Sequence, residues 1–239
     1  TTLFRSHELQ DATIAKGDTI TEPKFVTEHE ELEIFDKVLA NPPWNDKKWA
    51  KDWVQENEPY DRFPFGLPPS NRGDWAWIQR MLASLNKTGK AGIVLDTGIL
   101  FRSRSEQSIR KDVIENGLLD AVILLPENLF YNTSAPGCIL ILNKEDTDTE
   151  NNKVQFIYAT EDYAGKTNQN YLREEDVNKI TSAYHSSDEI DGYSRVVDIK
   201  EIRENDYNLK VSRYIDTTDE VSQIDVVEGW KTVSSLEQE

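Results

Sequence analysis

Three almost uninterrupted apolar runs constrain most strongly what this chain can fold into. They are AGIVL (91–95), LLDAVILL (118–125) and CILIL (138–142). Strands that are buried on both faces of a sheet read as continuous apolar runs, because neither face meets water. Helix-like segments precede the first two runs, at 74–86 and 105–116. The alternation predicts an α/β fold, in which helices cover both faces of a central sheet.

The two helices are predicted from apolar spacing and from signals at their ends. The first has Asp74 at its start, Gly89 as a stop, and apolar residues at helical spacing, namely Trp75, Ile78, Leu82 and Leu85. The second follows Ser103 and Glu106, which have the spacing of a capping box, and Gly117 closes it. Each helix is therefore expected to lead directly into a buried strand.

The remaining segments divide the chain into a main part, an extension and a tail. Residues 1–144 hold the main sheet, and its last two strands are joined by the polar loop 126–137, which favours an antiparallel pair. Residues 145–215 are expected to form a small α/β extension, with strands at 154–159 and 195–199 and a helix at 174–184. Residues 216–239 are polar and acidic and are expected to form a loosely held tail.

Composition excludes several classes of protein. The single Cys138 rules out a disulfide framework and a cysteine-based zinc site, and three scattered histidines leave no metal centre to predict. No apolar run approaches the length of a membrane-spanning helix, and the first ten residues lack the layout of a secretory signal. We therefore expect a soluble, cytoplasmic protein without a membrane partner.

The formal net charge is −17, from 27 basic and 44 acidic residues. Residues 1–144 account for −4 of it and residues 145–239 for −13. A strongly negative chain repels phosphate backbones at long range. Chemistry on nucleic acid would therefore require a local basic surface or a partner that holds the substrate.

The tetrapeptide Asn41-Pro42-Pro43-Trp44 follows the predicted strand 35–40. Two consecutive prolines cannot continue a strand, and in open α/β sheets ligands bind outside the carboxyl ends of the strands. The Asn41 side-chain oxygen and the Pro42 carbonyl are two acceptors in a stiffened turn, which suits an amino group on a planar ring, and Trp44 offers a stacking face. A simple turn that ends the strand is an equally good interpretation of the tetrapeptide alone.

The flanking sequence resembles a known family. FDKVLANPPW (35–44) resembles motif IV of the amino-directed methyltransferases that use S-adenosyl-L-methionine. The longer sequence resembles the methylation subunit of type I restriction–modification systems, an adenine-N6 DNA methyltransferase. The resemblance covers about 200 residues, in GDT (17–19), RFPFGLPPSNRGDWAWIQRML (62–82), GKAGIVLDTGILFRSRSEQSIRKDVIENGLLDAVILLPENLFYNTSAPGCILILNK (89–144) and YNLKVSRYID (207–216). It implies part of a Rossmann-like class I methyltransferase sheet, with an antiparallel last strand pair and a C-terminal extension.

The resemblance also implies roles for individual residues. Asn41 and the Pro42 carbonyl would accept hydrogen bonds from the amino group of a flipped-out adenine, in a turn that Pro43 stiffens. Trp44 would stack on the base. The methyl group would pass directly from S-adenosyl-L-methionine to the nitrogen, and no enzyme nucleophile would be needed.

Three further residues are candidates for the cofactor and base sites. Asp18 stands at the position that contacts the cofactor adenine in the family, and a solvated turn residue is the alternative. Phe130 or Tyr131 matches the position that closes the base pocket from its other face, and core packing is the alternative for both rings.

The chain departs from the family pattern in several places. The family's glycine-rich cofactor loop belongs before Gly17, and residues 1–16, with a predicted strand at 12–15, contain no glycine. The N-terminal helical domain is also missing, so the chain is expected to be the C-terminal part of a methylation subunit and inactive alone. Trp44 replaces the commoner Phe or Tyr, and Asp96-Thr97 stands where the family more often has proline.

Two weaker signals concern contact with DNA. Arg102, Arg104, Arg110 and Lys111 form a basic cluster that could meet phosphates, although scattered charge on a helix is the favoured interpretation. The tryptophans of the segment 44–73 could touch bases, or they could pack against the sheet.

The expected partners are DNA, a specificity subunit that reads the sequence, and a restriction and translocase subunit. Two alternatives stay open. The same motif serves methyltransferases that act on protein glutamine or on RNA guanine, and a truncated gene could leave a non-catalytic scaffold.

Overall fold

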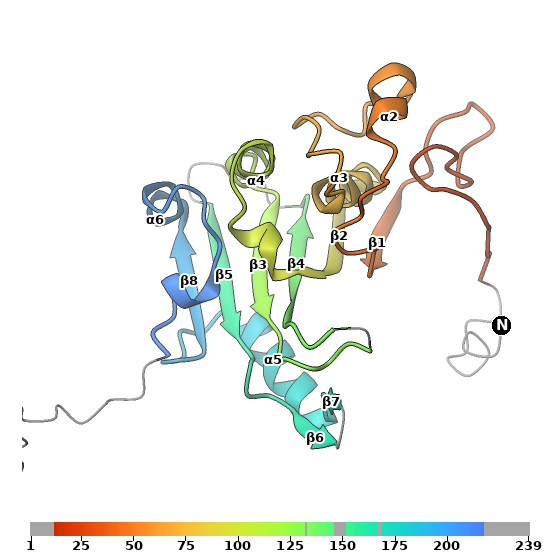
Figure 1. Ribbon diagram of the computed structural model, residues 1–239. Coiled ribbons are helices and arrows are strands. Elements are labelled where there is room, and N and C mark those ends of the chain that lie inside the picture. Colours follow the sequence, from red (N-terminus) through yellow and green to blue (C-terminus); the bar gives the residue numbers. More distant parts are fainter. Residues whose placement is uncertain (1–11, 132, 146–151, 167–168, 218–239) are drawn as a thin grey trace, which may run out of the picture.

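A six-stranded sheet forms the centre of the computed structural model, which describes residues 12–131, 133–145, 152–166 and 169–217. The strand order is β1-β2-β4-β3-β5-β8 (Figure 1). β1 is parallel to β2, and β3 is parallel to β5, whereas β4 runs antiparallel to both of its neighbours. The strands are β1 (Phe35–Ala40), β2 (Leu85–Asp96), β3 (Leu119–Leu124), β4 (Gly137–Asn143), β5 (Lys153–Tyr158) and β8 (Ser194–Asp198).

Helices cover both faces of this sheet, as the apolar runs predict. One core joins the sheet to α3 (Asp74–Ala83), α4 (Ser105–Glu115) and α6 (Ile199–Glu204), which group together in Figure 1. A second core joins the opposite face to α5 (Glu174–Ser186). Successive residues of β3 show why the strand is apolar throughout: Val122 belongs to the first core and Ile123 to the second. The shorter elements are α2 (Lys51–Asn57), η1 (Thr97–Leu100), β6 (Ala164–Lys166), β7 (Gln169–Tyr171) and η2 (Val211–Arg213).

The predicted buried strands are confirmed, and so is the antiparallel pair formed by β3 and β4, in which Leu124 lies opposite Cys138. The predicted end of the first helix is wrong. The helix ends at Ala83, and β2 begins at Leu85 and passes through Gly89. Leu85 is buried in the sheet core, and a Cβ on Gly89 would lie 3.0 Å from the carbonyl oxygen of Phe35. Gly89 therefore permits a close approach of strands and does not stop a helix.

Two other local predictions also fail. The capping box does not form: Arg104 is the N-cap of α4, with a φ of 64°, and the Glu106 carboxylate faces Arg102 instead of the helix start. The strand predicted at 12–15 is absent, because residues 12–16 have no regular structure. The helix stop at Gly117 is confirmed, since this glycine has the left-handed φ of 66° that a helix end requires.

The segment 44–73 contains α2 and has a small core of its own. Trp49 and Val54 pack with Ile20 and Ala76, so this segment is anchored on α3 and on the turn near residue 20. The buried Arg62 strengthens the second anchor, because its guanidinium pairs with Glu58 and donates to the backbone carbonyls of residues 19 and 20. Trp49 is therefore a core residue and does not face DNA.

The range expected as an extension, 145–215, contributes β5 and β8 to the main sheet. Phe156 and Tyr214 stack with ring centroids 4.2 Å apart beneath this part of the sheet. Arg110 of α4 donates to the Tyr207 carbonyl at 2.6 Å. Most of the tail predicted at 216–239 lies outside the described residues. Among the described residues, no helix has the length and apolar character needed to cross a membrane.

A surface ion pair links α4 to α6, and it leads to a prediction about how the stability of the fold changes at low pH. Glu115 accepts two hydrogen bonds from Arg203, at 2.8 and 2.7 Å, and one from the Tyr207 hydroxyl. The Arg203 contact lowers the pKa of Glu115 from its ordinary 4.5 to about 2. A carboxylate with a lowered pKa stabilises the fold above its unfolded pKa, and this stabilisation is lost as the pH falls toward the folded value.

We therefore expect the free energy of unfolding to decrease between pH ~4.5 and ~2 in part through Glu115. Glu115→Gln should make that decrease smaller, by a modest amount because the pair is partly exposed to water. Urea unfolding at a series of pH values measures this. The same pH dependence in wild type and variant would contradict the prediction.

Candidate active site

Four strands meet where the tetrapeptide lies. β1 and β2 are parallel, so their carboxyl ends lie at the same edge of the sheet. Asn41 follows β1 directly, and Asp96 is the last residue of β2. β4 begins at this edge, since Gly137 lies opposite Asp96, and the loop after β3 returns here. Together they enclose a cavity of about 850 Å³, whose lining includes Asn41, Pro42, Pro43, Trp44, Asn45, Asp96, Leu129, Phe130, Tyr131 and Thr133. The structure thus brings together the tetrapeptide and both candidate rings of the distant loop.

The Trp44 indole orients the Asn41 side chain. Its Nε1–H donates to Asn41 Oδ1 at 3.1 Å and to the Val94 carbonyl of β2 at 3.2 Å. Because an indole N–H is only a donor, the Asn41 atom that faces it is the oxygen. A carboxamide oxygen has two lone pairs, so a second donor can still bind it. Among the described residues, none donates to the Pro42 carbonyl, and the turn therefore offers two acceptors.

Phe130, and not Tyr131, is the ring that faces Trp44. The Phe130 and Trp44 centroids lie 4.7 Å apart with the rings at 69°, an edge-to-face contact. Gly137 makes room for both, because a Cβ there would lie 2.7 Å from Phe130 and 3.1 Å from Trp44. Tyr131 lines the cavity but is 92% exposed, so core packing does not explain it.

The site also contains residues that the sequence did not place there. Asn45 follows the tetrapeptide, and a hydrogen-bonded group of Asp74, Asp96 and Arg102 lies beside it. Asn45 and Arg102 are 57 positions apart in the chain, and no short motif links residues so far apart. For Asn45, the position next to the tetrapeptide is the one feature of the sequence that could have indicated a role in the site.

The basic cluster predicted at residues 102–111 does not form a surface for phosphates. Arg110 is buried and donates to three backbone carbonyls, and Arg102 is directed into the acidic group. Arg104 and Lys111 are exposed, and the Lys111 ammonium lies over the Tyr207 ring at 5.6 Å. The favoured interpretation, scattered charge on a helix face, describes Lys111 of α4, but not Arg110, which is buried, or Arg102, which precedes the helix.

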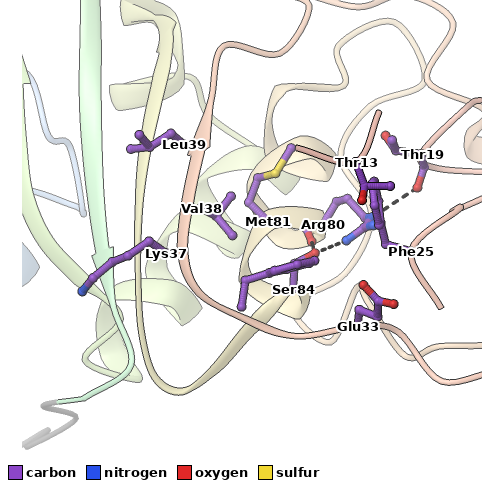
Figure 2. A pocket seen from close by; sticks show the side chains of 11 residues that line it. Thr13, Thr19, Phe25, Glu33, Lys37, Val38, Leu39, Arg80, Met81 and Ser84 are labelled. Carbon is purple, nitrogen blue, oxygen red and sulfur yellow. Dashed lines mark hydrogen bonds between the residues drawn. The ribbon is translucent and has the colours of Figure 1, made fainter. Parts of the chain in front are cut away.

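Asp18 lies in an exposed turn on the other side of β1. Its Oδ1 accepts hydrogen bonds from the N–H groups of Ile20 and Thr21, at 2.8 and 3.3 Å. The adjacent Thr19 lines a hollow of about 560 Å³ between this turn, β1 and α3, shown in Figure 2. In Figure 2 Arg80 extends across the hollow to the Thr19 carbonyl, which it reaches at 3.1 Å.

Asp18 is compatible with one half of an adenosylated cofactor, although it does not itself line the hollow. The Asp18 carboxylate retains an oxygen that can accept a hydrogen bond from an adenosine group, and the hollow beside Thr19 adjoins it. Among the described residues, no glycine-rich loop is present to receive the amino-acid half, since Gly17 is the first glycine. Residues 1–16 contain no glycine, so the glycine-rich loop expected from the family does not lie in this stretch.

Cys138 is not available as a nucleophile. It is fully buried at the start of β4, and burial raises the pKa of its thiol far above the ordinary value. Because the thiolate is the reactive form of cysteine, the buried thiol is inert.

Comparison with known proteins identifies the family. The model of the family described as N-6 DNA Methylase matches residues 2–223, which is most of the chain. The chain belongs to the N-6 DNA methylase family. A member of this family therefore contains the tetrapeptide, the antiparallel β4 and the loop that carries Phe130.

Individual relatives agree with this assignment. The type I restriction enzyme MjaVIII methylase subunit of Methanocaldococcus jannaschii is 42% identical over 97% of this chain and 41% of its own length. The HindI methylase subunit of Haemophilus influenzae is 30% identical over 85% of this chain and 46% of that protein. The crystal structure of the type I methyltransferase subunit from Streptococcus thermophilus has a TM-score of 0.75 and 38% identity, covering 84% of this chain and 42% of that one.

These comparisons confirm the predicted family and the class I methyltransferase sheet. The chain spans about two fifths of the length of the curated relatives it matches first.

Proposed function

We propose that this chain supplies the base-binding part of a type I methylation subunit that transfers a methyl group to the N6 of adenine in DNA. One observation carries the proposal: Asn41, whose Oδ1 is oriented by Trp44, and Pro42 line the same cavity as the Trp44 and Phe130 rings. Membership of the N-6 DNA methylase family supports it.

The acceptors account for the chemistry at the amino group. The N6 nitrogen of adenine is a weak nucleophile, because its lone pair is delocalised into the ring. Hydrogen bonds from both N6 hydrogens to Asn41 Oδ1 and the Pro42 carbonyl favour a geometry in which the lone pair is localised on nitrogen. As the nitrogen becomes positively charged, the same two oxygens stabilise that charge, and their fixed orientation avoids a reorganisation cost.

The aromatic pair accounts for the binding of a flipped base. An enzyme that modifies a base extrudes it from the duplex and holds it between apolar side chains. In this structure Trp44 and Phe130 touch each other, so each ring occupies space that a sandwiched base needs. We propose that the base enters by separating the two rings, with Phe130 moving because Trp44 is held by two hydrogen bonds.

S-adenosyl-L-methionine, when bound, supplies a methyl group activated by a positively charged sulfur. Asp18 is the residue of this chain proposed to accept a hydrogen bond from the adenosine half, with Thr19 beside it. Pro43 stiffens the turn on the opposite side of β1, and the buried Cys138 takes no part.

DNA, a specificity subunit and a restriction and translocase subunit are the proposed partners. The net charge of −17 disfavours independent DNA binding, so a separate subunit is proposed to read the sequence and hold the duplex. Proteins described as methylase subunits of type I restriction enzymes are the relatives that support this assembly.

The test is methyl transfer from labelled S-adenosyl-L-methionine to DNA by the full-length gene product together with its specificity subunit, followed by nucleoside analysis. We expect N6-methyladenine as the labelled product. Label in glutamine or in RNA guanine would favour the other methyltransferase classes instead. A folded complex that binds DNA and labels nothing would favour the non-catalytic scaffold.

A further inference from the structure

The Arg102 guanidinium binds two residues that line the cavity, although Arg102 itself does not line it. Arg102 donates from one terminal nitrogen to Asn45 Oδ1 and Asp96 Oδ1, each at 2.6 Å. Its other terminal nitrogen donates to Asp74 Oδ2 at 2.9 Å and approaches Glu106 Oε1 at 3.4 Å. Asn45 and Asp96 both line the cavity, whereas Arg102 does not.

Arg102 and Asp74 hold the tetrapeptide through Asn45. Asn45 follows Trp44 directly and has a left-handed φ of 52°, a conformation that asparagine adopts more readily than most residues other than glycine. Its N–H donates to Asp74 Oδ1 at 2.8 Å, and its side-chain oxygen accepts from Arg102. Asp74 binds both Asn45 and Arg102, so the backbone and the side chain of Asn45 are fixed by the same group.

Asp96 is also held by more than one hydrogen bond. Its Oδ1 also accepts from the N–H of Gly98 at 2.8 Å, which caps η1 after β2. Gly98 lies directly against the guanidinium, and a side chain at this position would displace it.

The surroundings require an arginine at position 102. The Arg102 side chain is 14% exposed, while those of Asp74 and Glu106 are at most 2% exposed, so water cannot substitute for it. Four acceptors surround the planar fork of the guanidinium, whereas a lysine offers three donors from a single atom. Arg110 also donates to the Arg102 carbonyl at 3.0 Å, which holds the backbone of this residue in place.

We propose that Arg102 is a positioning residue for methyl transfer. It sets the distance between the turn 41–45 and the turn that follows β2. This distance in turn sets how Asn41 Oδ1 and the Pro42 carbonyl align with the bound base. Arg102 acts through Asn45 and Asp96 and does not touch the substrate. This inference rests on the proposed function.

The test uses Arg102→Lys in the full-length subunit with its specificity subunit. We expect kcat to fall about 10- to 100-fold, because small misplacements of reacting groups have effects of this size. The KM values for DNA and for S-adenosyl-L-methionine should stay within about twofold, because the lost alignment matters at the transition state. The matched control is Arg195→Lys, which removes a similar two-pronged contact, with Glu201, far along the sheet in β8.

A second measurement does not depend on activity. Hydrogen exchange at the Asn45 amide should be faster in Arg102→Lys than in Arg195→Lys, since the Asp74 carboxylate that holds this amide loses its own partner. Asn45→Gly removes the side-chain acceptor and retains a backbone that allows the positive φ, so it tests the same link if Arg102→Lys does not fold. Asn45→Gly should lower kcat, and the double variant should be no worse than Arg102→Lys alone.

The outcomes separate this inference from the proposed function. Active Arg102→Lys and Asn45→Gly variants with wild-type kcat would overturn the role of Arg102 and leave adenine methylation intact. Unchanged exchange at Asn45, or fully additive effects in the double variant, would overturn it as well. A wild-type complex that methylates no adenine would overturn the proposed function, and the inference with it.

Discussion

Asn41→Ala is expected to lower kcat for adenine methylation by about 100-fold or more, the range seen when one oriented hydrogen-bond partner of a transition state is removed. The variant loses the acceptor that faces the N6 amino group, while the Pro42 carbonyl remains. Asn41 is exposed, and its one side-chain contact is with Trp44, so the fold should be almost unaffected. Steady-state methyl transfer, with thermal unfolding of the same sample, measures both quantities.

Two variants sharpen this experiment. Asn86→Ala is the matched control, because this asparagine binds Asp36 near the opposite ends of β1 and β2; it should retain wild-type activity. Asn41→Asp keeps an oxygen where Asn41 accepts from Trp44, so it should retain more activity than Asn41→Ala. Wild-type kcat in Asn41→Ala would show that the tetrapeptide is only a turn that ends β1.

Trp49→Ala is expected to lower the free energy of unfolding by about 3–5 kcal/mol, as is typical when a large buried aromatic side chain is removed. Trp49 is 2% exposed and packs with Ile20, Val54 and Ala76. Its indole donates to the Pro69 carbonyl at 2.9 Å, and a Cβ on Gly73 would lie 2.6 Å from the Trp49 Cβ. Trp49→Ala would leave a cavity among these buried side chains, and the lost packing adds to the lost burial of the indole.

Urea unfolding measures this loss, and Trp53→Ala is the control, because Trp53 of α2 packs against the same core but is only partly buried. Trp53→Ala should have a clearly smaller effect. Equal effects of the two variants would contradict the assignment of Trp49 to the core. Because the same core holds Ile20, we also expect Trp49→Ala to loosen the turn that contains Asp18.

The sheet could be predicted from the sequence wherever both faces of a strand are buried. The apolar runs of β2, β3 and β4 identify these strands, because they are too short for a typical helix and suit a strand packed on both faces. Boundaries were less predictable. The spacing that ends in Leu85 suits a helix, yet pairing with Phe35 places Leu85 in β2, because tertiary contacts override local periodicity.

Some features of the candidate site could likewise be predicted from the sequence, and others could not. The tetrapeptide could be found because proline and asparagine have local, readable consequences for the backbone and for hydrogen bonding. Between Phe130 and Tyr131 no local signal decides, since both are aromatic residues in one loop. The distinction depends on which ring meets Trp44, some 86 positions earlier, and on the absence of a side chain at Gly137.

The sequence alone therefore determined the fold class and the family, and it located the tetrapeptide at the end of a strand, because each depends on local pattern or on residue identity. Only the tertiary structure showed that Arg102 is part of the site and that Arg110 is not a surface cation. A buried charge needs partners, and these come from whichever elements the fold brings together. For Arg102 they are Asn45, Asp74, Asp96 and Glu106, which come from separate parts of the chain and meet at one edge of the sheet.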